Sequence, residues 1–334
     1  MLSMKITRGQ VLAAASAVLG SGLVPDAPAQ AAAAVWSAQY TATKGSVSLA
    51  VYRKRATAPK AGEQPLPVLL LAHGSSVSAI PTFDLTVPGA GEYSVMNVFA
   101  QGGFDAWAVD FENYGRSSRT DSNSDIASGA ADLRATTDLI ARETGTTKYH
   151  LFGESSGGLR AALFAAQNPD RVARLALSAY TYTGEGSPTF VNRAKDLAYY
   201  KTHSRRLRDA TMIESIFTRD KPGTSDPRLA AAIAAIELKY GDQVPTGTYL
   251  DMTANLPIVD PAKVTVPVLL LRGEYDGIAT MVDLMSFYEK LPNGDRQFVV
   301  VPSAAHSLVW AKNRQLFWHA LRAFLTEPPY TPVS

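Results

Sequence analysis

The chain has 334 residues, of which 46% are hydrophobic and 19% charged, so it is apolar enough to fold around a core and is not disordered as a whole. Its formal net charge of +2 gives no strong overall field for nucleic acid or an anionic membrane. It contains no cysteine, which excludes disulfides, thiolate metal sites and a cysteine nucleophile. The length is compatible with one large α/β domain, with or without an insertion, or with two small domains.

The first residues have the pattern of an export signal. Lys5 and Arg8 precede an uncharged run over residues 11–24, which is too short to span a bilayer. Small residues follow, with an A-x-A sequence at Ala29-Gln30-Ala31. We therefore expect a signal peptide at residues 1–31, cleavage close to its end, and a secreted or periplasmic mature protein. An alanine-rich N-terminal helix is the alternative.

The rest of the chain alternates between short apolar strands and helices. In chain order, the patterns predict strands over 36–41, 46–53 and 67–72, a helix over 93–101, a strand over 105–110, a helix over 125–143, a strand over 149–152, a helix over 156–167, a strand over 172–179, a strand over 266–271, a helix over 280–290, a strand over 297–301 and a helix over 310–325. Strands separated by helices favour right-handed crossovers. We therefore expect an α/β fold with a mostly parallel central sheet flanked by helices.

Residues 181–261 interrupt this alternation and are predicted to be mainly helical. Because they lie between two core strands, we expect an inserted cap that divides the core into residues 36–180 and 262–326. Residues 327–334 are expected to form a loose C-terminal tail.

The inserted segment carries many aromatic residues and one basic cluster. The aromatic side chains are expected to form the segment's own core, and a subset is expected to line an apolar pocket. Arg205, Arg206 and Arg208 can be interpreted as an attractor for an anionic substrate or as a solvated helix face, and the sequence favours the solvated face.

The motif that indicates chemistry is Gly153-Glu154-Ser155-Ser156-Gly157, a G-x-S-x-G sequence between a predicted strand and a predicted helix. Glycines flank the serine because the turn is sharp and leaves no room for side chains. Such a turn places the Ser155 hydroxyl above the carboxyl edge of the sheet. It also places the Ser156 N–H at a helix N-terminus, where it can stabilise an oxyanion. We predict that Ser155 is a nucleophile.

A serine nucleophile needs a base, and the base needs a carboxylate that orients it. Of the five histidines, His306 is the best candidate, because it follows the last predicted strand in a loop of small residues. The acid is expected between serine and histidine in chain order. Asp276 is favoured because the Asp-Gly turn after a core strand aims its carboxylate inward. Glu274 in the same loop is the second candidate, and Glu185 is a more distant third.

A second oxyanion donor is expected after the early strand at 67–72. His73-Gly74-Ser75 follows that strand directly, and the backbone N–H of Ser75 is the favoured donor. His73 itself is expected to be structural.

Together these features resemble the α/β-hydrolase-fold serine hydrolases of the esterase and lipase type, with an inserted cap. The residues that carry the resemblance appear in the family's order: His73-Gly74, the loop from Asp110 to Ser117, the motif from Gly153 to Gly158, Asp276 and His306. One departure is Asn113, where many relatives have glycine, and asparagine adopts similar backbone angles. The serine at position 155 argues against the dehalogenase and epoxide-hydrolase branches, which use aspartate there.

The resemblance and the residues together predict an exported serine hydrolase that cleaves a carboxylic ester of a small molecule through an acyl-enzyme. No cofactor, no metal, no nucleic acid and no stable membrane insertion are expected. The same residues also serve the cleavage of an amide, a lactone or a carbon–carbon bond. A non-catalytic binding protein on this fold is a third hypothesis.

Overall fold

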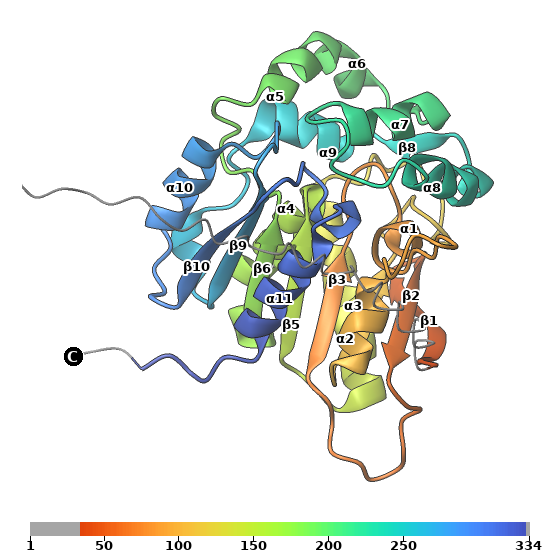
Figure 1. The fold of residues 1–334 in the computed structure, drawn as a ribbon, viewed down its shortest axis with the longest axis vertical. Coiled ribbons are helices and arrows are strands. Elements are labelled where there is room, and N and C mark those ends of the chain that lie inside the picture. Colours follow the sequence, from red (N-terminus) through yellow and green to blue (C-terminus); the bar gives the residue numbers. More distant parts are fainter. Residues whose placement is uncertain (1–33, 332–334) are drawn as a thin grey trace, which may run out of the picture. The chain divides into compact units, whose positions relative to one another are not determined.

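An eight-stranded sheet forms the centre of the structure, a computed structural model that describes residues 34–331 (Figure 1). Its strands are β1 (Trp36–Lys44), β2 (Val47–Arg55), β3 (Val68–Ala72), β4 (Asp105–Val109), β5 (Tyr149–Glu154), β6 (Val172–Ser178), β9 (Val268–Gly273) and β10 (Arg296–Val301). They follow the order β1-β2-β4-β3-β5-β6-β9-β10. Strand β2 pairs antiparallel with both β1 and β4, and all other neighbours in this sheet pair parallel. The predicted mostly parallel sheet is confirmed. The predicted signal peptide lies outside the described residues.

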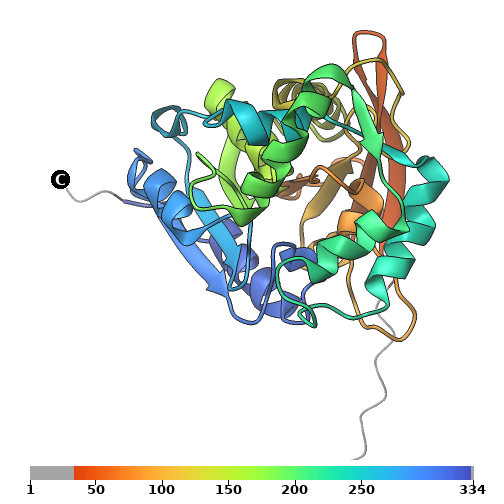
Figure 2. The same cartoon turned by 90° about the horizontal axis from the view of Figure 1, so that it is seen from above.

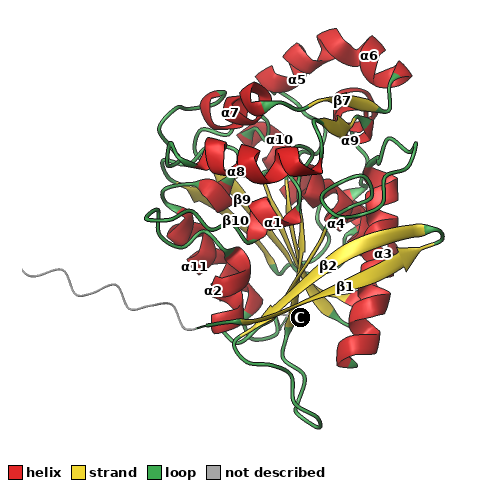
Figure 3. Cartoon of the chain, turned by 90° about the vertical axis from the view of Figure 1, so that its right-hand side faces the viewer, coloured by secondary structure: helices red, strands yellow, loops and turns green. Residues whose placement is uncertain are grey.

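Helices cover both faces of this sheet, as Figure 3 shows. One face is covered by α3 (Ile126–Thr144), α4 (Ser156–Gln167) and α10 (Met281–Glu289), and the other by α1 (Ala79–Phe83), α2 (Val95–Gln101) and α11 (Arg314–Leu325). Alternate residues of one strand therefore enter different cores: Leu70 of β3 packs in the first, and Leu69 and Leu71 pack in the second. Both faces are buried, which explains why the central strands are continuous apolar runs.

Local signals in the sequence set the bounds of several helices. The Asp125 carboxylate accepts a hydrogen bond from the Ser128 N–H at 2.7 Å and caps the start of α3. Gly145, with a φ of 72°, ends that helix in the left-handed conformation. The predicted start of the last helix at residue 310 is wrong. Residues Leu308–Trp310 form a short 3₁₀ turn, and α11 begins at Arg314.

The segment between β6 and β9 contains five short helices and a two-stranded ribbon. They are α5 (Pro188–Arg193), α6 (Leu197–Thr202), α7 (Ala210–Thr218), α8 (Leu229–Glu237), α9 (Gly247–Leu250), and β7 (Arg205–Leu207) paired with β8 (Gln243–Pro245). Figures 1 and 2 show these elements together at one end of the sheet. The Ser78 N–H donates to the Glu237 carboxylate at 2.7 Å, and the Gly247 N–H donates to the Asn123 carbonyl at 2.7 Å. The segment is therefore held to the core by hydrogen bonds, and its interpretation as a cap stays a prediction.

The basic cluster of this segment does not form a solvated helix face, and that expectation is wrong. Arg205 and Arg206 belong to the ribbon strand β7, and Arg208 is buried in an ion pair with Glu237. The Arg205 guanidinium donates to the carbonyl of Ser122 at 2.5 Å. Two of the three arginines, Arg205 and Arg208, therefore make contacts that hold the fold together. Among residues 34–331, no helix has the length and apolarity needed to cross a membrane.

Candidate active site

The sharp turn between β5 and α4 holds Ser155 in an unusual backbone conformation, with a φ of 56° and a ψ of −125°. A non-glycine residue in this region is strained and needs surroundings that enforce it. The close approach of the neighbouring backbone supplies them. A Cβ added to Gly153 would lie 2.4 Å from the Gly157 carbonyl oxygen, and one added to Gly157 would lie 2.1 Å from the Ala72 carbonyl oxygen. The two flanking glycines are therefore required by packing.

Three predicted residues meet at the carboxyl end of the sheet in one hydrogen-bonded row. His306 Nδ1 lies 2.8 Å from Asp276 Oδ1, and His306 Nε2 lies 2.9 Å from Ser155 Oγ. Because a carboxylate only accepts, Nδ1 carries the proton of the neutral ring. Nε2 is then the acceptor for the Ser155 hydroxyl. This geometry prepares the hydroxyl to lose its proton to the imidazole.

The two alternative acids lie elsewhere. The Glu274 carboxylate is exposed and accepts a hydrogen bond from the Ser303 N–H at 2.7 Å. Glu185 is exposed as well, and no contact between it and His306 occurs among the described residues. The Asp276 side chain is fully buried, and its Oδ1 also accepts from the Ile278 N–H at 2.8 Å. Backbone donors therefore fix the orientation of Asp276 toward the histidine.

His73 has the structural position that the sequence predicts. Its Nδ1–H donates to the Gly74 carbonyl at 2.8 Å, and its Nε2 accepts from the Phe111 N–H at 3.2 Å. Burial, together with the nearby Arg160 guanidinium, lowers the pKa of His73 to about 3. A ring that stays neutral and has both nitrogens engaged in this way is not available as a base.

The two predicted oxyanion residues are joined through their side chains. The Ser75 hydroxyl donates to the Ser156 hydroxyl at 2.8 Å and accepts from the Thr248 hydroxyl at 2.9 Å. The Tyr114 hydroxyl donates to the Ser75 carbonyl at 2.9 Å. Within residues 34–331, no protein atom accepts a hydrogen bond from the backbone N–H of Ser75 or Ser156. Both N–H groups are therefore free to bind an oxygen atom. No sequence pattern indicates the contact of Thr248 with Ser75.

The loop after β4 shapes this region through a buried carboxylate. Asp110 accepts from the Ala79 N–H at 2.8 Å and from the Arg116 N–H at 2.9 Å. Asn113 has a φ of 70°, which confirms that asparagine takes the left-handed conformation here. A Cβ added to Gly115 would lie 2.1 Å from Asp110 Oδ2, so only glycine fits beside the carboxylate.

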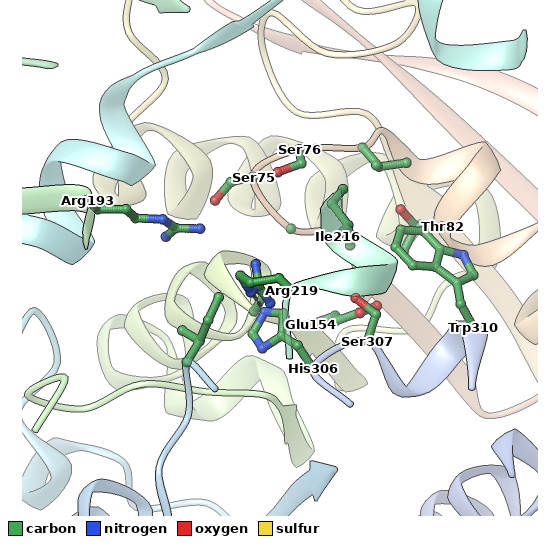
Figure 4. A pocket seen from close by; sticks show the side chains of 14 residues that line it. Ser75, Ser76, Thr82, Glu154, Arg193, Ile216, Arg219, His306, Ser307 and Trp310 are labelled. Carbon is green, nitrogen blue, oxygen red and sulfur yellow. Dashed lines mark hydrogen bonds between the residues drawn. The ribbon is translucent and has the colours of Figure 1, made fainter. Parts of the chain in front are cut away.

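A small cavity of about 50 Å³ opens beside Ser155 and His306 (Figure 4). The apolar part of its wall includes Val77, Ile216, Ile278 and Trp310, and the polar part includes Ser75, Ser76, Glu154, Arg193 and Arg219. A larger and more open cavity of about 410 Å³ adjoins it and shares Arg193 and Arg219. The small cavity suits the reacting group of a substrate, and the larger one has room for the remainder.

Glu154, the residue before the predicted nucleophile, is a buried carboxyl in the wall of the small cavity. Its side chain is 3% exposed, and Oε2 has no hydrogen-bond partner among the described residues. Burial raises the pKa of Glu154 to about 8; the Ser307 hydroxyl opposes the shift, and the Asp276 charge adds to it. The group is therefore a neutral acid near pH 7. The G-x-S-x-G pattern gave no signal for this role, because its second position admits any residue.

Comparison with solved structures shows the same fold in several enzymes. A thermophilic esterase from Thermogutta terrifontis is 21% identical, with a TM-score of 0.61 over 87% of this chain and 98% of that one. A bromoperoxidase from Bacillus anthracis is 18% identical, with a TM-score of 0.62 over 87% of this chain and 100% of that one. A hydrolase from Pseudomonas aeruginosa PA01 is 18% identical, with a TM-score of 0.61 over 86% and 98% of the two chains. These likenesses show the fold alone.

No curated protein matches the chain. One family model, described as serine aminopeptidase, S33, matches residues 87–312, which is more than half of the sequence. The match covers the serine turn, the segment between β6 and β9, and the loops that carry Asp276 and His306. The chain therefore belongs to the S33 family of α/β-hydrolase-fold serine hydrolases.

Proposed function

We infer that the protein is an esterase in which Ser155, His306 and Asp276 form a catalytic triad. The observation that carries the proposal is the row of hydrogen bonds, 2.9 Å from serine to histidine and 2.8 Å from histidine to aspartate, beside a cavity. A serine in a strained turn at a helix N-terminus, with a histidine nitrogen within hydrogen-bond reach, has the parts needed for nucleophilic attack.

The proposed reaction begins when the Ser155 hydroxyl attacks the ester carbonyl and His306 Nε2 takes its proton. Asp276 stabilises the imidazolium that forms. The imidazolium then protonates the leaving alcohol, and the acyl group remains on Ser155 as an ester. Water that loses its proton to His306 attacks this acyl-enzyme and releases the carboxylic acid.

The backbone N–H groups of Ser75 and Ser156 stabilise the negative oxygen of both tetrahedral intermediates in this proposal. Their freedom from protein acceptors supports the assignment. The side-chain bonds from Thr248 to Ser75 and from Ser75 to Ser156 hold the two donors at a fixed spacing. A preorganised pair of donors needs little rearrangement when charge develops on the substrate.

An ester suits the cavity better than the free amino terminus that an aminopeptidase must bind. The only carboxyl in the wall of the small cavity, among the described residues, is Glu154, which is neutral near pH 7. In the adjoining cavity, Asp220 is already bound by Arg219 at 2.7 Å. Asp196, the other carboxylate of that cavity, shares the wall with three arginines, so a protonated amine would meet more positive than negative charge there.

A screen of p-nitrophenyl esters of increasing acyl length, beside the matching p-nitroanilide, tests the proposal. We expect the esters to react faster, and we expect Ser155→Ala to lower kcat by roughly 10⁴–10⁶. Ser303→Ala, which removes an exposed hydroxyl from a nearby loop, is the matched control. A Ser155→Ala protein that kept a tenth of wild-type turnover would overturn the assignment. Faster cleavage of the anilide would identify an amidase, and failure of a fluorophosphonate to label the wild type would favour a binding protein.

A further inference from the structure

Three arginines of the segment between β6 and β9 line the small cavity beside Ser155 or the larger cavity that adjoins it. Arg193 at the end of α5 and Arg219 after α7 line both cavities, and Arg206 of β7 lines the larger one. Figure 4 shows the side chains of Arg193 and Arg219 reaching into the small cavity from this segment. The route from Ser155 into the larger cavity is therefore bordered by guanidinium groups.

Arg193 and Arg206 stand out because neither has a counter-ion. Their guanidinium carbons lie 5.0 Å and 4.7 Å from the ring centre of Tyr249. Within residues 34–331, neither side chain donates a hydrogen bond or forms an ion pair. Two cations thus share one aromatic ring. Its attraction for each is worth only about 1 kcal/mol, and their charges repel each other.

Two neighbouring arginines, in contrast, each form an ion pair with a carboxylate. Arg208 forms a buried ion pair with Glu237, and Arg219 donates to both oxygens of Asp220 at 2.7 Å and 2.9 Å. The remaining carboxylate in the wall of the larger cavity belongs to Asp196. It accepts from the Tyr200 hydroxyl at 3.4 Å and is not within ion-pair distance of Arg193 or Arg206. The cavity therefore keeps unbalanced positive charge.

The surroundings of Arg193 make this charge unfavourable without an anion. Protein atoms enclose the side chain while part of its surface stays open to the cavities, and burial lowers the pKa of Arg193 below its usual value. A carboxylate strongly stabilises a partly desolvated guanidinium, because the two groups match in geometry and pair through two hydrogen bonds. An anionic ligand would remove the repulsion between the two arginines as well.

We propose that Arg193 and Arg206 bind a carboxylate of the substrate while its ester carbonyl lies at Ser155, so that the preferred substrates are esters with a negatively charged group. The inference rests on the proposed esterase function and adds a substrate class to it. Arg219, already paired with Asp220, borders the path between the two positions.

Two pairs of esters test the proposal and locate the charge. The first pair compares p-nitrophenyl hemiglutarate with p-nitrophenyl valerate, so that the carboxylate is on the acyl group. The second compares 4-acetoxybenzoate with 4-acetoxybenzamide, so that it is on the leaving group. In at least one pair, we expect the kcat/KM of the wild type to be at least about tenfold higher for the anionic ester than for the neutral one. One hydrogen-bonded pair of opposite charges contributes a difference of this size.

Arg193→Gln and Arg206→Gln should each lower this anion-to-neutral ratio by about tenfold, and the double variant should abolish the preference. Arg142→Gln, which removes an exposed arginine of α3 that lines neither cavity, should keep the wild-type ratio. A ratio near one in the wild type for both pairs would overturn the proposal. So would a ratio that is unchanged in the double variant.

A binding measurement separates this proposal from the esterase proposal. Glutarate should raise the unfolding temperature of the wild type and of Arg142→Gln, and the effect should be lost in the double variant of Arg193 and Arg206. If no ester were cleaved but this effect occurred, the esterase function would fail and the anion site would stand. If neutral esters were cleaved and glutarate had no effect on the wild type, the anion site would fail alone.

Discussion

Replacing Glu154 by glutamine should stabilise the protein increasingly as the pH rises from about 5 to 8. Burial raises the pKa of Glu154 from 4.5 to about 8 in the folded chain. The unfolded chain releases this proton near pH 4.5, whereas the folded chain holds it until about pH 8. The stability associated with the neutral acid is therefore fully present below about pH 4.5 and is lost as the pH rises toward 8.

The loss of unfolding free energy is set by the interval between the pKa of Glu154 in the unfolded chain and its pKa in the folded chain. Each pH unit is worth about 1.4 kcal/mol, so the whole interval from 4.5 to 8 corresponds to about 5 kcal/mol of unfolding free energy as an upper bound. Glutamine does not titrate and has nearly the same shape, so Glu154→Gln avoids the loss. The difference in unfolding free energy between variant and wild type should grow by at most about 1.4 kcal/mol for each pH unit.

Urea unfolding at several pH values between 5 and 8, followed by circular dichroism, measures that difference. Glu274→Gln is the matched control, because it removes an exposed carboxylate from the loop after β9 and should leave the pH profile of stability unchanged. If wild type and Glu154→Gln showed parallel profiles over this range, Glu154 would ionise at its ordinary pKa. Burial would then have no effect on the pKa of this carboxyl.

Three further predictions concern the triad, the oxyanion donors and the N-terminus. Asp276→Asn should lower kcat on a p-nitrophenyl ester by roughly 10³–10⁴ near neutral pH, and Glu274→Gln by less than about tenfold; the reverse ranking would move the acid to Glu274. Thr248→Val should lower kcat about fivefold, because Ser75 loses a buried hydrogen bond worth about 1 kcal/mol, and an unchanged kcat would show that Ser75 is held without it. N-terminal sequencing of exported protein should find a start near residues 32–36, and Met1 on the mature, active protein would contradict the signal peptide.

The sequence predicts helices best where both ends are set by local signals. The bounds of α4 are those predicted, because the serine turn starts the helix and Asn168-Pro169 stops it. The sequence predicts the start of α11 four residues too early, because Trp310 looks like part of the same apolar face. In the structure the Trp310 Nε1–H donates to the Pro81 carbonyl at 3.1 Å, a contact across 229 positions that holds it in a separate turn.

The difference between local signals and contacts of distant segments also explains which parts of the site could be predicted. Ser155, Asp276 and His306 each follow a strand of the parallel sheet, and such strands bring their carboxyl ends to one edge whatever the length of chain between them. Thr248 reaches Ser75 from the segment between β6 and β9, across 173 positions, and no periodicity predicts that approach. The surroundings of Glu154 likewise include Ser307, which lies 153 positions away, so its motif alone does not predict its burial.

Arginines show why the substrate class needs the structure. Arg205, Arg206 and Arg208 lie within four positions and look equivalent in the sequence. In the folded chain Arg205 donates to the backbone carbonyl of Ser122, and Arg208 pairs with the carboxylate of Glu237. The Arg206 guanidinium lies above the ring of Tyr249, in the wall of the larger cavity. The three arginines therefore differ only in the partners that distant segments bring to them, and Arg206 has no acceptor among the described residues. Arg206 lines the larger cavity, which shares Arg193 and Arg219 with the small cavity beside Ser155, and the carboxylate of the proposed substrate would supply the missing partner there.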